Sequence, residues 1–499
     1  MSNGTPSSAR PGEPLLWFNG LDGRTGSYLL PPAPARHLTD FALGAPVDRA
    51  RARELQAWVA RGEGKARRGL KEGLDPGKLD EAGWGVIFAR SAEIEPLREA
   101  LAPLLDLRRA QAGKRQERFY REFTGESGYR EGETKIEFLA RHGAGPGPAD
   151  PEKVPYYLLL VGDPEAIPFS FQYQLDVQYA VGRLCFDAIE DYRRYAESVV
   201  AAEAGAAGRR SNGHPKRRAC FFAPANPRDP VTVSTNAHLV QPVAAGVRRD
   251  LPGWSIETVL GEEATRGRLG DLLEEAPAFL FAACHGLGFA ADDPAQRDRQ
   301  GALVCQDWPG PGGFSGKGGI DREHYFAAED VGDRARVHGL IAFCFACFGA
   351  GTPRWDEFTR KSQGNRRELA PGAFLGRLPQ RLLSHPQGGA LAVVGHVDRA
   401  WGFSMVWPEA GPQICAFESA LRRLLDGQPV GWAMEYFNQR YAELASDLAA
   451  EVEALGFGKK LDETVIADLW TASHDARNYT IIGDPAVRVA VPPLSGGVL

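Results

Sequence analysis

A histidine and a cysteine follow two of the most apolar runs in the chain. His285 ends a run that begins at Phe279, and Cys347 ends a run that begins at Leu340. Each run has the length and composition of a buried strand. The carboxyl ends of strands in an open α/β sheet border the crevice where ligands bind. The pattern therefore predicts that the imidazole and the thiol meet at one edge of a sheet.

The chemistry available to such a pair is attack on a peptide carbonyl. A thiol attacks as its thiolate, so a neighbouring group must take the thiol proton and later protonate the leaving amine. An imidazole, with a pKa near neutrality, serves both steps. Gly286, directly after the histidine, lets a backbone N–H approach the carbonyl oxygen. We expect the N–H groups of Gly286 and Cys347 to form the oxyanion hole.

Three other interpretations use the same residues. Cys284, His285, Cys344 and Cys347 are the ligand types of a zinc site. Zinc is disfavoured because Cys344 lies inside an apolar run and no second closely spaced ligand pair is present. A redox pair of Cys344 and Cys347 is disfavoured because such pairs normally open a helix. The third interpretation, a buried inert thiol, is the one we prefer for Cys185, Cys220, Cys284, Cys344 and Cys415.

Composition describes an ordinary globular chain. Its 499 residues carry a formal net charge of -6, with 43% hydrophobic and 24% charged residues. This balance gives no electrostatic reason to bind nucleic acid or an anionic membrane. No apolar run reaches the roughly 18 residues of a membrane span. The scattered cysteines form no disulfide framework, and the polar start, residues 1–14, lacks the layout of a secretory signal. We expect a cytoplasmic protein with a disordered tail.

The order of predicted elements is that of an α/β protein. Strand patterns at 84–89 and 154–161 alternate with helical patterns at 93–112 and 189–202. A polar, basic segment at 204–218 is the clearest linker, and alternation restarts after it. We therefore expect a mostly parallel sheet flanked by helices. The final segment, 478–491, has the pattern of a closing strand pair.

Four further segments share their order with a known family, over roughly residues 80–490. They are YYLLLVGDPEAIP at 156–168, LDVQYAVGRL at 175–184, GGALAVVGHVDRAWGFSM at 388–405 and NYTIIGDPAVRV at 478–489. Together with the two strands ending in His-Gly and Ala-Cys-x-Gly, they make the chain resemble the gingipain family of caspase-like cysteine peptidases (clan CD). The piece at 301–307 is closer to caspase-like CHAT domains.

The resemblance implies a caspase-like α/β fold with two adjacent subdomains. We place a partly disordered N-terminal extension at 1–79, a non-catalytic subdomain at 80–210 and the catalytic subdomain at 211–499. Carried over to this sequence, Cys347 is the nucleophile, His285 the acid and base, and Gly286 an oxyanion donor.

The substrate pocket departs from the family pattern. Trp401 is expected to form a pocket wall, with ordinary core packing as an equal alternative. Where gingipains carry an acid beside the histidine, this chain has Asn226, with Asp229 nearby as a substitute. No acid falls at 234–236, the expected place of the arginine-selecting acid, so arginine specificity does not transfer. Asp398 could favour a basic residue before the cleaved bond, with a helix-start or salt-bridge role as the alternative.

The sequence thus predicts a bacterial cytoplasmic cysteine endopeptidase that cleaves proteins through an acyl-enzyme. Its chemistry needs no metal or other cofactor, although the resemblance allows a structural calcium ion. The family setting implies regulated proteolysis, including bacterial defence. The segments 204–218 and 360–367 are candidate sites for self-cleavage or for cleavage by an upstream activating protease, with ordinary exposed loops as the default interpretation. The alternatives are a non-catalytic caspase-like scaffold that binds a partner protein and a Cys/His zinc-site protein.

Overall fold

The structure is a computed structural model of the 499-residue chain. It describes residues 15–16, 19–30, 33–34, 69–90, 93–206, 217–311, 320–360, 366–407, 410–456, 460 and 462–491. Most of the predicted cleavage loops, 207–216 and 361–365, lies outside the described residues.

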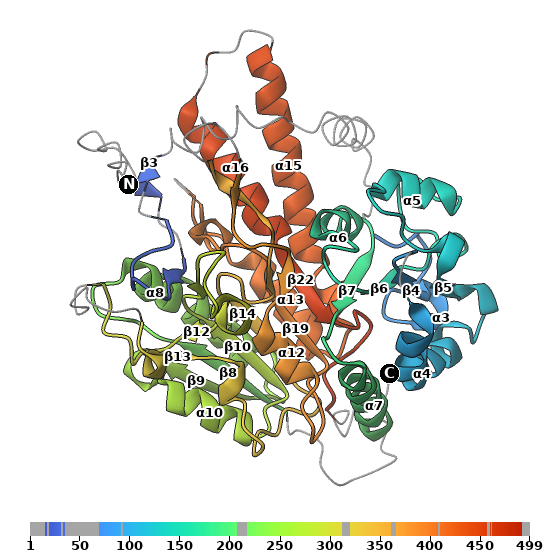
Figure 1. The fold of residues 1–499 in the computed structure, drawn as a ribbon, viewed down its shortest axis with the longest axis horizontal. Helices are drawn as coiled ribbons and strands as arrows, with labels where there is room; N and C mark the ends of the chain where they lie inside the picture. The colour runs from blue at the N-terminus through green and yellow to red at the C-terminus, as the bar shows by residue number, and fades with distance from the viewer. Residues whose placement is uncertain are drawn as a thin grey trace.

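A ten-stranded sheet runs through the centre of the molecule (Figure 1). Neighbouring strands are parallel except for β19 and β22, which pair antiparallel. The prediction of a mostly parallel α/β sheet is confirmed. In spatial order the strands are β5 (Tyr120–Phe123), β4 (Trp84–Phe88), β6 (Tyr157–Val161), β7 (Ala180–Leu184), β22 (Tyr479–Gly483), β19 (Ala392–His396), β14 (Ile341–Phe345), β10 (Phe279–Ala283), β8 (Arg218–Ala223) and β9 (Ser255–Leu260).

The antiparallel pair divides the sheet into two halves that run in opposite directions. The C-terminal strand β22 is parallel to β7 and antiparallel to β19, so it joins the two halves into one continuous sheet. The carboxyl ends of β8, β10, β14 and β19 therefore share one edge. The predicted subdomain boundaries at 79/80 and 210/211 remain a prediction.

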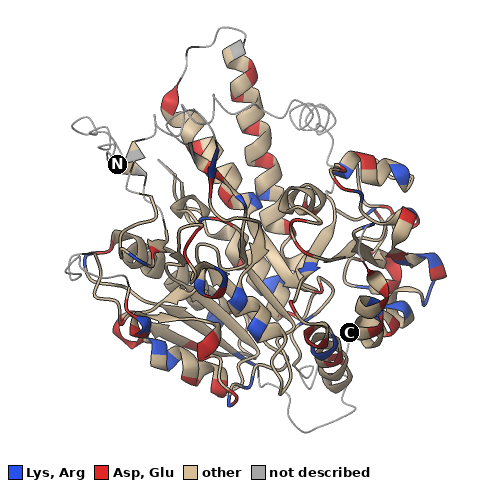
Figure 2. Ribbon diagram, viewed as in Figure 1, with Lys and Arg blue, Asp and Glu red and all other residues tan. Residues whose placement is uncertain are grey.

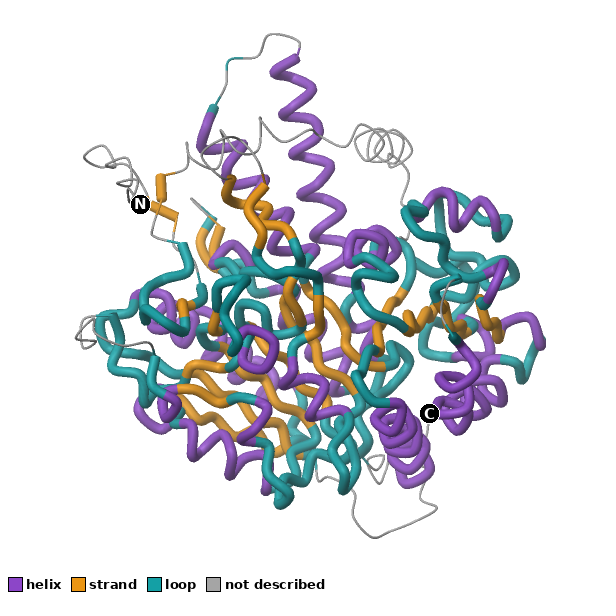
Figure 3. The backbone as a smooth tube through the Cα atoms, viewed as in Figure 1, coloured by secondary structure: helices purple, strands orange, loops and turns teal. Residues whose placement is uncertain are grey.

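Helices surround the sheet, as the tube in Figure 3 shows. Helices α4 and α7 pack on each other beside the N-terminal half of the sheet. Helices α15 and α16 form a long pair beside the other half of the sheet (Figure 1). The helices are α3 (Leu79–Ala82), α4 (Ile94–Ala112), α5 (Lys135–Arg141), α6 (Phe169–Asp176), α7 (Ile189–Ala206), α8 (Pro230–Thr235), α9 (Gln241–Asp250), α10 (Arg266–Glu274), α11 (Gln296–Arg299), α12 (Arg377–Leu383), α13 (Cys415–Leu425), α14 (Val430–Ala433), α15 (Glu435–Gly456) and α16 (Glu463–Arg477).

The central strands are buried on both faces because helices cover both. Every residue of β10 and β14 is buried, which explains why their sequences are continuous apolar runs without alternation. On one face the rings of Phe281 and Phe343 meet Phe417 of α13. Burial of such rings contributes about 1.5–3 kcal/mol each, so this core holds the strand ends in register.

Small paired strands lie outside the central sheet. Most relevant is β2, which pairs in parallel with β11 beside the end of β10. The small strands are β1 (Leu15–Leu16), β2 (Leu21–Asp22), β3 (Ala33–Pro34), β11 (Leu287–Gly288), β12 (Leu303–Val304), β13 (Tyr325–Phe326), β15 (Gly351–Thr352), β16 (Trp355–Arg360), β17 (Arg366–Glu368), β18 (Phe374–Leu375), β20 (Val406–Trp407) and β21 (Gly411–Pro412).

The predicted closing strand pair at 478–491 is wrong in its second part. Only β22 is a strand, and the chain then turns at Asp484. The buried Asp484 carboxylate accepts hydrogen bonds from Trp84 Nε1 at 2.9 Å and from Arg108 Nε at 2.6 Å. These charge-assisted bonds fix a turn where the apolar pattern suggested a second strand.

The outer surface mixes charges of both signs. In Figure 2 acidic and basic residues are interspersed over the outer helices. None of the helices in the described ranges combines the length and apolar composition needed to cross a bilayer.

Candidate active site

The sheet brings the predicted histidine and cysteine segments into contact. Strands β10 and β14 are parallel neighbours, with Ala283 opposite Phe345. His285 and Cys347 each lie two residues past the end of their strand. A Cβ on Gly286 would lie 1.9 Å from the carbonyl oxygen of Cys347. Backbone approach this close requires glycine at 286. The two segments thus touch at the carboxyl edge of the sheet.

Hydrogen bonds on both ring nitrogens define the tautomer of His285. Its Nδ1 lies 2.8 Å from the backbone nitrogen of Gly20, which can only donate. The Nδ1 atom is therefore the acceptor, and Nε2 carries the proton. Nε2 donates to Oδ2 of Asp229 at 2.8 Å. Both side chains are fully buried, so this bond fixes the ring orientation.

Asp229 is held as a carboxylate by several donors. It caps α8 by accepting hydrogen bonds from the backbone N–H groups of Val231 and Thr232, and it accepts the Tyr28 hydroxyl at 2.6 Å. Burial alone would raise the pKa of Asp229, but the electrostatic interaction with His285 and the hydrogen bonds that the carboxylate accepts outweigh burial and lower it. The group beside the histidine is therefore ionised at neutral pH.

The acid beside His285 is Asp229, the substitute named from the sequence, and not Asn226. The Asn226 amide donates to the backbone carbonyls of Cys305 at 3.0 Å and Trp308 at 2.8 Å. These bonds tie two loops together in the interior, where Asn226 is fully buried. These contacts do not support the expected role of Asn226 in the substrate pocket.

Cys347 is fully buried just beyond the end of β14. Its Sγ accepts the backbone N–H of Ala400 at 3.2 Å and donates to the carbonyl oxygen of Asn19. Burial raises the pKa of this thiol, so it is protonated in the state described.

Two residues beside the thiol have left-handed backbones without being glycine. Phe348 has φ 59° and Asp398 has φ 86°, and the Phe348 N–H donates to the Asp398 carbonyl at 2.7 Å. Such conformations cost about 1–3 kcal/mol each and cluster at functional sites. The segment after Cys347 stays beside the end of β19, where the Ala350 N–H donates to the His396 carbonyl at 2.9 Å.

Asp398 and Trp401, the other predicted pocket residues, are both buried. Asp398 accepts hydrogen bonds from the backbone N–H and the guanidinium of Arg399. Burial raises the pKa of Asp398, and the Asp356 charge adds to the rise against the opposing effect of Arg399. Trp401 packs on Phe358 with ring centroids 4.7 Å apart. These contacts agree with the salt-bridge and core-packing alternatives, and the pocket roles stay predictions.

The buried ion cluster beside the thiol supplies a stability prediction. Arg399 donates to Asp356 at 2.9 and 3.1 Å, and both side chains are almost wholly buried. Asp356→Ala should lower the free energy of unfolding by about 3–5 kcal/mol, because it leaves a buried cation without its main partner. Urea unfolding measures this. Glu274→Ala, which breaks the exposed pair with Arg334, is the control, with an expected loss of about 0–1 kcal/mol.

The four residues of the zinc alternative do not converge as a group of ligands. Among the described residues, the metal-type side chains whose ligand atoms converge are Asp321, Glu323 and His324 on the surface. Cys284, Cys344 and Cys347 are not in such a group. Cys344 lies within β14, and burial raises the pKa of its thiol to about 12, which disfavours the thiolate that zinc requires.

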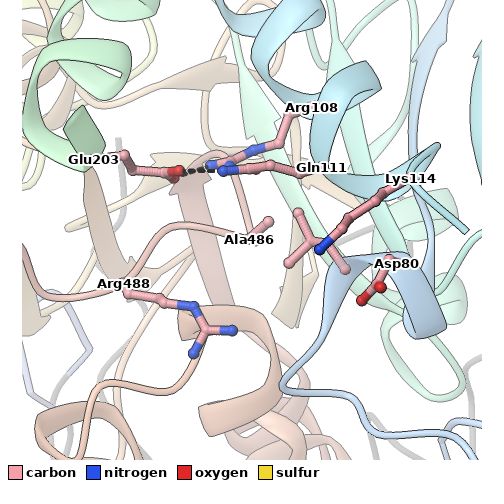
Figure 4. Close-up of a pocket in the computed structure, with 8 residues that line it drawn as sticks. Asp80, Arg108, Gln111, Lys114, Glu203, Ala486 and Arg488 are labelled. Carbon is pink, nitrogen blue, oxygen red and sulfur yellow. Dashed lines mark hydrogen bonds and ion pairs between the residues drawn. The ribbon is translucent and has the colours of Figure 1, made fainter. Parts of the chain in front are cut away.

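Several pockets hollow the part of the chain that the structure describes. One of about 350 Å³ borders Asp398 and is lined by Tyr173, Trp355 and Arg477. Another, of about 280 Å³, lies between α3, α4 and α7 (Figure 4). There the buried Arg108 forms an ion pair with Glu203, so the charge of Arg108 is neutralised within the protein. Neither pocket is lined by Cys347 or His285, whose surface is covered by the chain itself.

Residues 19–30, which we name the N-terminal strap, make that cover. The strap was expected to belong to a partly disordered extension. In the structure Asn19 contacts Cys347, Gly20 contacts His285 and Tyr28 contacts Asp229. Sequence analysis missed these residues because an Asn-Gly pair signals an ordinary turn. Nothing local in the sequence marks a contact with residues more than 200 positions away.

Comparison with known proteins yields similarity of fold alone. No model of a known protein family matches the chain, and no curated protein matches its sequence. A solved structure described as a protease is 13% identical, covers 83% of this chain and 80% of its own, and has a TM-score of 0.45.

Two further solved structures are of gingipain. The Arg-specific cysteine proteinase gingipain R is 12% identical over 85% of this chain and 80% of its own, with a TM-score of 0.43. The complex of the RgpB pro- and mature domains of Porphyromonas gingivalis is 12% identical, covers 82% of this chain and 79% of its own, and has a TM-score of 0.39.

Proposed function

We propose that the chain is a cysteine endopeptidase with Cys347 as nucleophile, His285 as acid and base, and Asp229 as the group that orients the imidazole. The observation that carries this proposal is the position of one peptide group. The carbonyl of Asn19 lies on the thiol, and the nitrogen of Gly20 lies 2.8 Å from Nδ1 of His285. A peptide bond between thiol and imidazole is the arrangement that thiol-mediated cleavage requires.

Each group has a defined task in the proposed reaction. Nδ1 of His285 takes the thiol proton, and the thiolate attacks the carbonyl carbon. The backbone N–H groups of Gly286 and Cys347 stabilise the oxyanion. His285 then protonates the leaving amine, and water hydrolyses the thioester. Asp229 keeps the proton on Nε2 and stabilises the imidazolium, as its lowered pKa allows. No step requires a metal.

The proposed substrates are proteins, because the groups described recognise a peptide bond and its backbone. The cytoplasmic setting and a role in regulated proteolysis or bacterial defence are carried over from the sequence resemblance. The same holds for an upstream activating protease and for a structural calcium ion.

A profile of newly formed protein N-termini tests the proposal. The wild-type chain and Gly20→Ala are each incubated with a cell lysate, with and without Cys347→Ala. Gly20→Ala is included because a Cβ at this position would lie 2.7 Å from Cys347 Sγ and displace the strap. We expect new N-termini that require Cys347, and Cys415→Ala, which alters an exposed thiol, should leave them unchanged.

The same experiment weighs the scaffold alternative. The complete burial of Cys347 and His285 favours a chain that binds partners without cutting them. Identical N-termini with and without Cys347, in the wild type and in Gly20→Ala alike, would refute the peptidase and support the scaffold.

A further inference from the structure

The strap forms backbone hydrogen bonds with the chain along the edge of β11. The Leu21 N–H donates to the Gly286 carbonyl at 3.1 Å, and the Gly23 N–H donates to the Gly288 carbonyl at 2.8 Å. Leu21 is fully buried, and Arg24 forms an ion pair with Asp293. Strand addition of this kind is how extended peptides bind clefts bordered by a free strand. The strap therefore lies in the cleft as a bound peptide would.

The Asn19–Gly20 peptide group lies across the candidate dyad. Its carbonyl oxygen accepts the Cys347 thiol, and its nitrogen faces Nδ1 of His285 at 2.8 Å. The carbonyl lies on the nucleophile and the nitrogen on the base, which matches the order in which a cleaved bond meets these groups. A chain inserted in the reverse direction would exchange the two contacts.

The side chain before this bond is held by its amide. Asn19 Nδ2 donates to the carbonyl of Cys284 at 3.0 Å, and the side chain is 2% exposed. A donor is required there, because an aspartate would place a carboxylate oxygen against a carbonyl oxygen. Oδ1 is buried without a hydrogen-bond partner among the described residues. The subsite thus selects a short side chain that ends in an N–H donor.

The residue after the bond is restricted to glycine. Gly20 has φ 110°, in the left-handed region, and a Cβ there would lie 2.7 Å from Cys347 Sγ and 2.8 Å from Leu29 Cδ1. Glycine thus lets the peptide approach the thiol closely. The Asn-Gly pair fits the site at both positions.

We propose that Cys347 cleaves the chain's own bond between Asn19 and Gly20, and that the site accepts asparagine before a cleaved bond. The inference rests on the proposed peptidase function. The Cys347 sulfur forms a thioester with the Asn19 carbonyl carbon as the C–N bond to Gly20 breaks. The thiol proton passes through His285 to the Gly20 nitrogen. Water then hydrolyses the thioester, which yields an Asn19 carboxylate and restores the thiol.

Release of residues 1–19 would uncover the thiol. The Asn19 carbonyl accepts the Cys347 thiol proton in the intact chain, while the Gly20 N–H occupies Nδ1 of His285. Cleavage separates these two contacts, so Asn19 can leave with the segment before it. The intact chain is then the latent form of the peptidase.

Intact mass and N-terminal sequencing of the purified full-length chain test the inference. The wild type should begin at Gly20, and Cys347→Ala should retain residues 1–19. Asn19→Asp should slow the cleavage by at least about 10²-fold, because a subsite built around a hydrogen bond rejects an analogue that lacks the donor. The chain contains two other Asn-Gly pairs, at Asn3 and Asn212, and Asn212→Asp is the matched control that should leave cleavage at Asn19 unchanged.

The outcomes separate this inference from the proposed function. If Gly20→Ala cuts other proteins through Cys347 while the wild-type bond at Asn19 stays intact, the self-cleavage inference is wrong and the peptidase stands. If neither reaction occurs, both fail. Cleavage at Asn19 that persists in Cys347→Ala, or that proceeds equally fast in Asn19→Asp, also overturns the inference.

Discussion

Asp229→Asn should lower kcat/KM for peptide cleavage by roughly 10²- to 10⁴-fold while the chain stays folded. The carboxylate fixes the His285 tautomer through the 2.8 Å bond to Nε2 and stabilises the imidazolium that forms when the thiol proton is taken. An asparagine offers no charge and can present its NH₂ group to Nε2, which would reverse the tautomer. Steady-state kinetics with a peptide substrate measure the loss.

The substitution separates chemistry from folding because asparagine caps helices about as well as aspartate. The cap of α8 by Asp229 should therefore survive. Asp462→Asn is the matched control, since Asp462 caps α16 in the same way through Thr464 and Val465. We expect the control to keep wild-type activity. Activity of Asp229→Asn within about threefold of the wild type would remove Asp229 from the site.

The lowered pKa of Asp229 also predicts how its effect on stability depends on pH. A carboxyl group with a lower pKa in the folded state stabilises the fold above its unfolded pKa, near 3.9, and loses this contribution as the pH falls toward the folded value. The difference in unfolding free energy between wild type and Asp229→Asn should therefore be largest at neutral pH and shrink below about pH 4. Urea unfolding at both pH values measures it.

Gly286→Ala should reduce activity by about 10²- to 10³-fold, the scale of losing an oxyanion donor. The new Cβ would meet the Cys347 carbonyl oxygen at 1.9 Å and its nitrogen at 2.8 Å, so the two segments would have to separate. Separation moves the thiol away from the imidazole and opens the expected oxyanion hole. Overpacking of this kind also costs about 1–3 kcal/mol of stability.

Activity and thermal unfolding measured together distinguish these two effects. Gly267→Ala, in α10, is the control, because no atom outside the helix lies within 4 Å of a Cβ at that position. We expect that variant to be fully active and slightly more stable, since alanine favours a helix over glycine by about 1 kcal/mol. If Gly286→Ala is as active as Gly267→Ala, the contact between the two segments has no catalytic importance.

Local patterns in the sequence predicted the sheet and the positions of His285 and Cys347 at its strand ends. Parallel central strands are buried on both faces, so β10 and β14 must be continuous apolar runs, and such runs are visible in one dimension. A polar residue directly after such a run lies at the end of the strand, and this position does not depend on how the rest of the chain folds. His285 and Cys347 could therefore be singled out before their contact was known.

The sequence alone could not choose among groups that meet through the tertiary fold. Asn226 and Asp229 lie in the same loop after β8, and only the packing of that loop on Trp308 and Cys305 turns the amide inward and the carboxylate toward His285. The antiparallel pairing of β19 and β22 likewise depends on which strands the fold places side by side, and no local sequence pattern predicts it.

The strap shows the same limit most clearly. What the sequence determined by itself was a thiol and an imidazole at the ends of two buried strands, because burial on both faces makes such strands continuous apolar runs. What the tertiary structure decided was which peptide lies between them. The Asn19–Gly20 contact joins residues more than 260 positions apart. A contact at that separation depends on where the whole sheet places its edge, and no local pattern records that position.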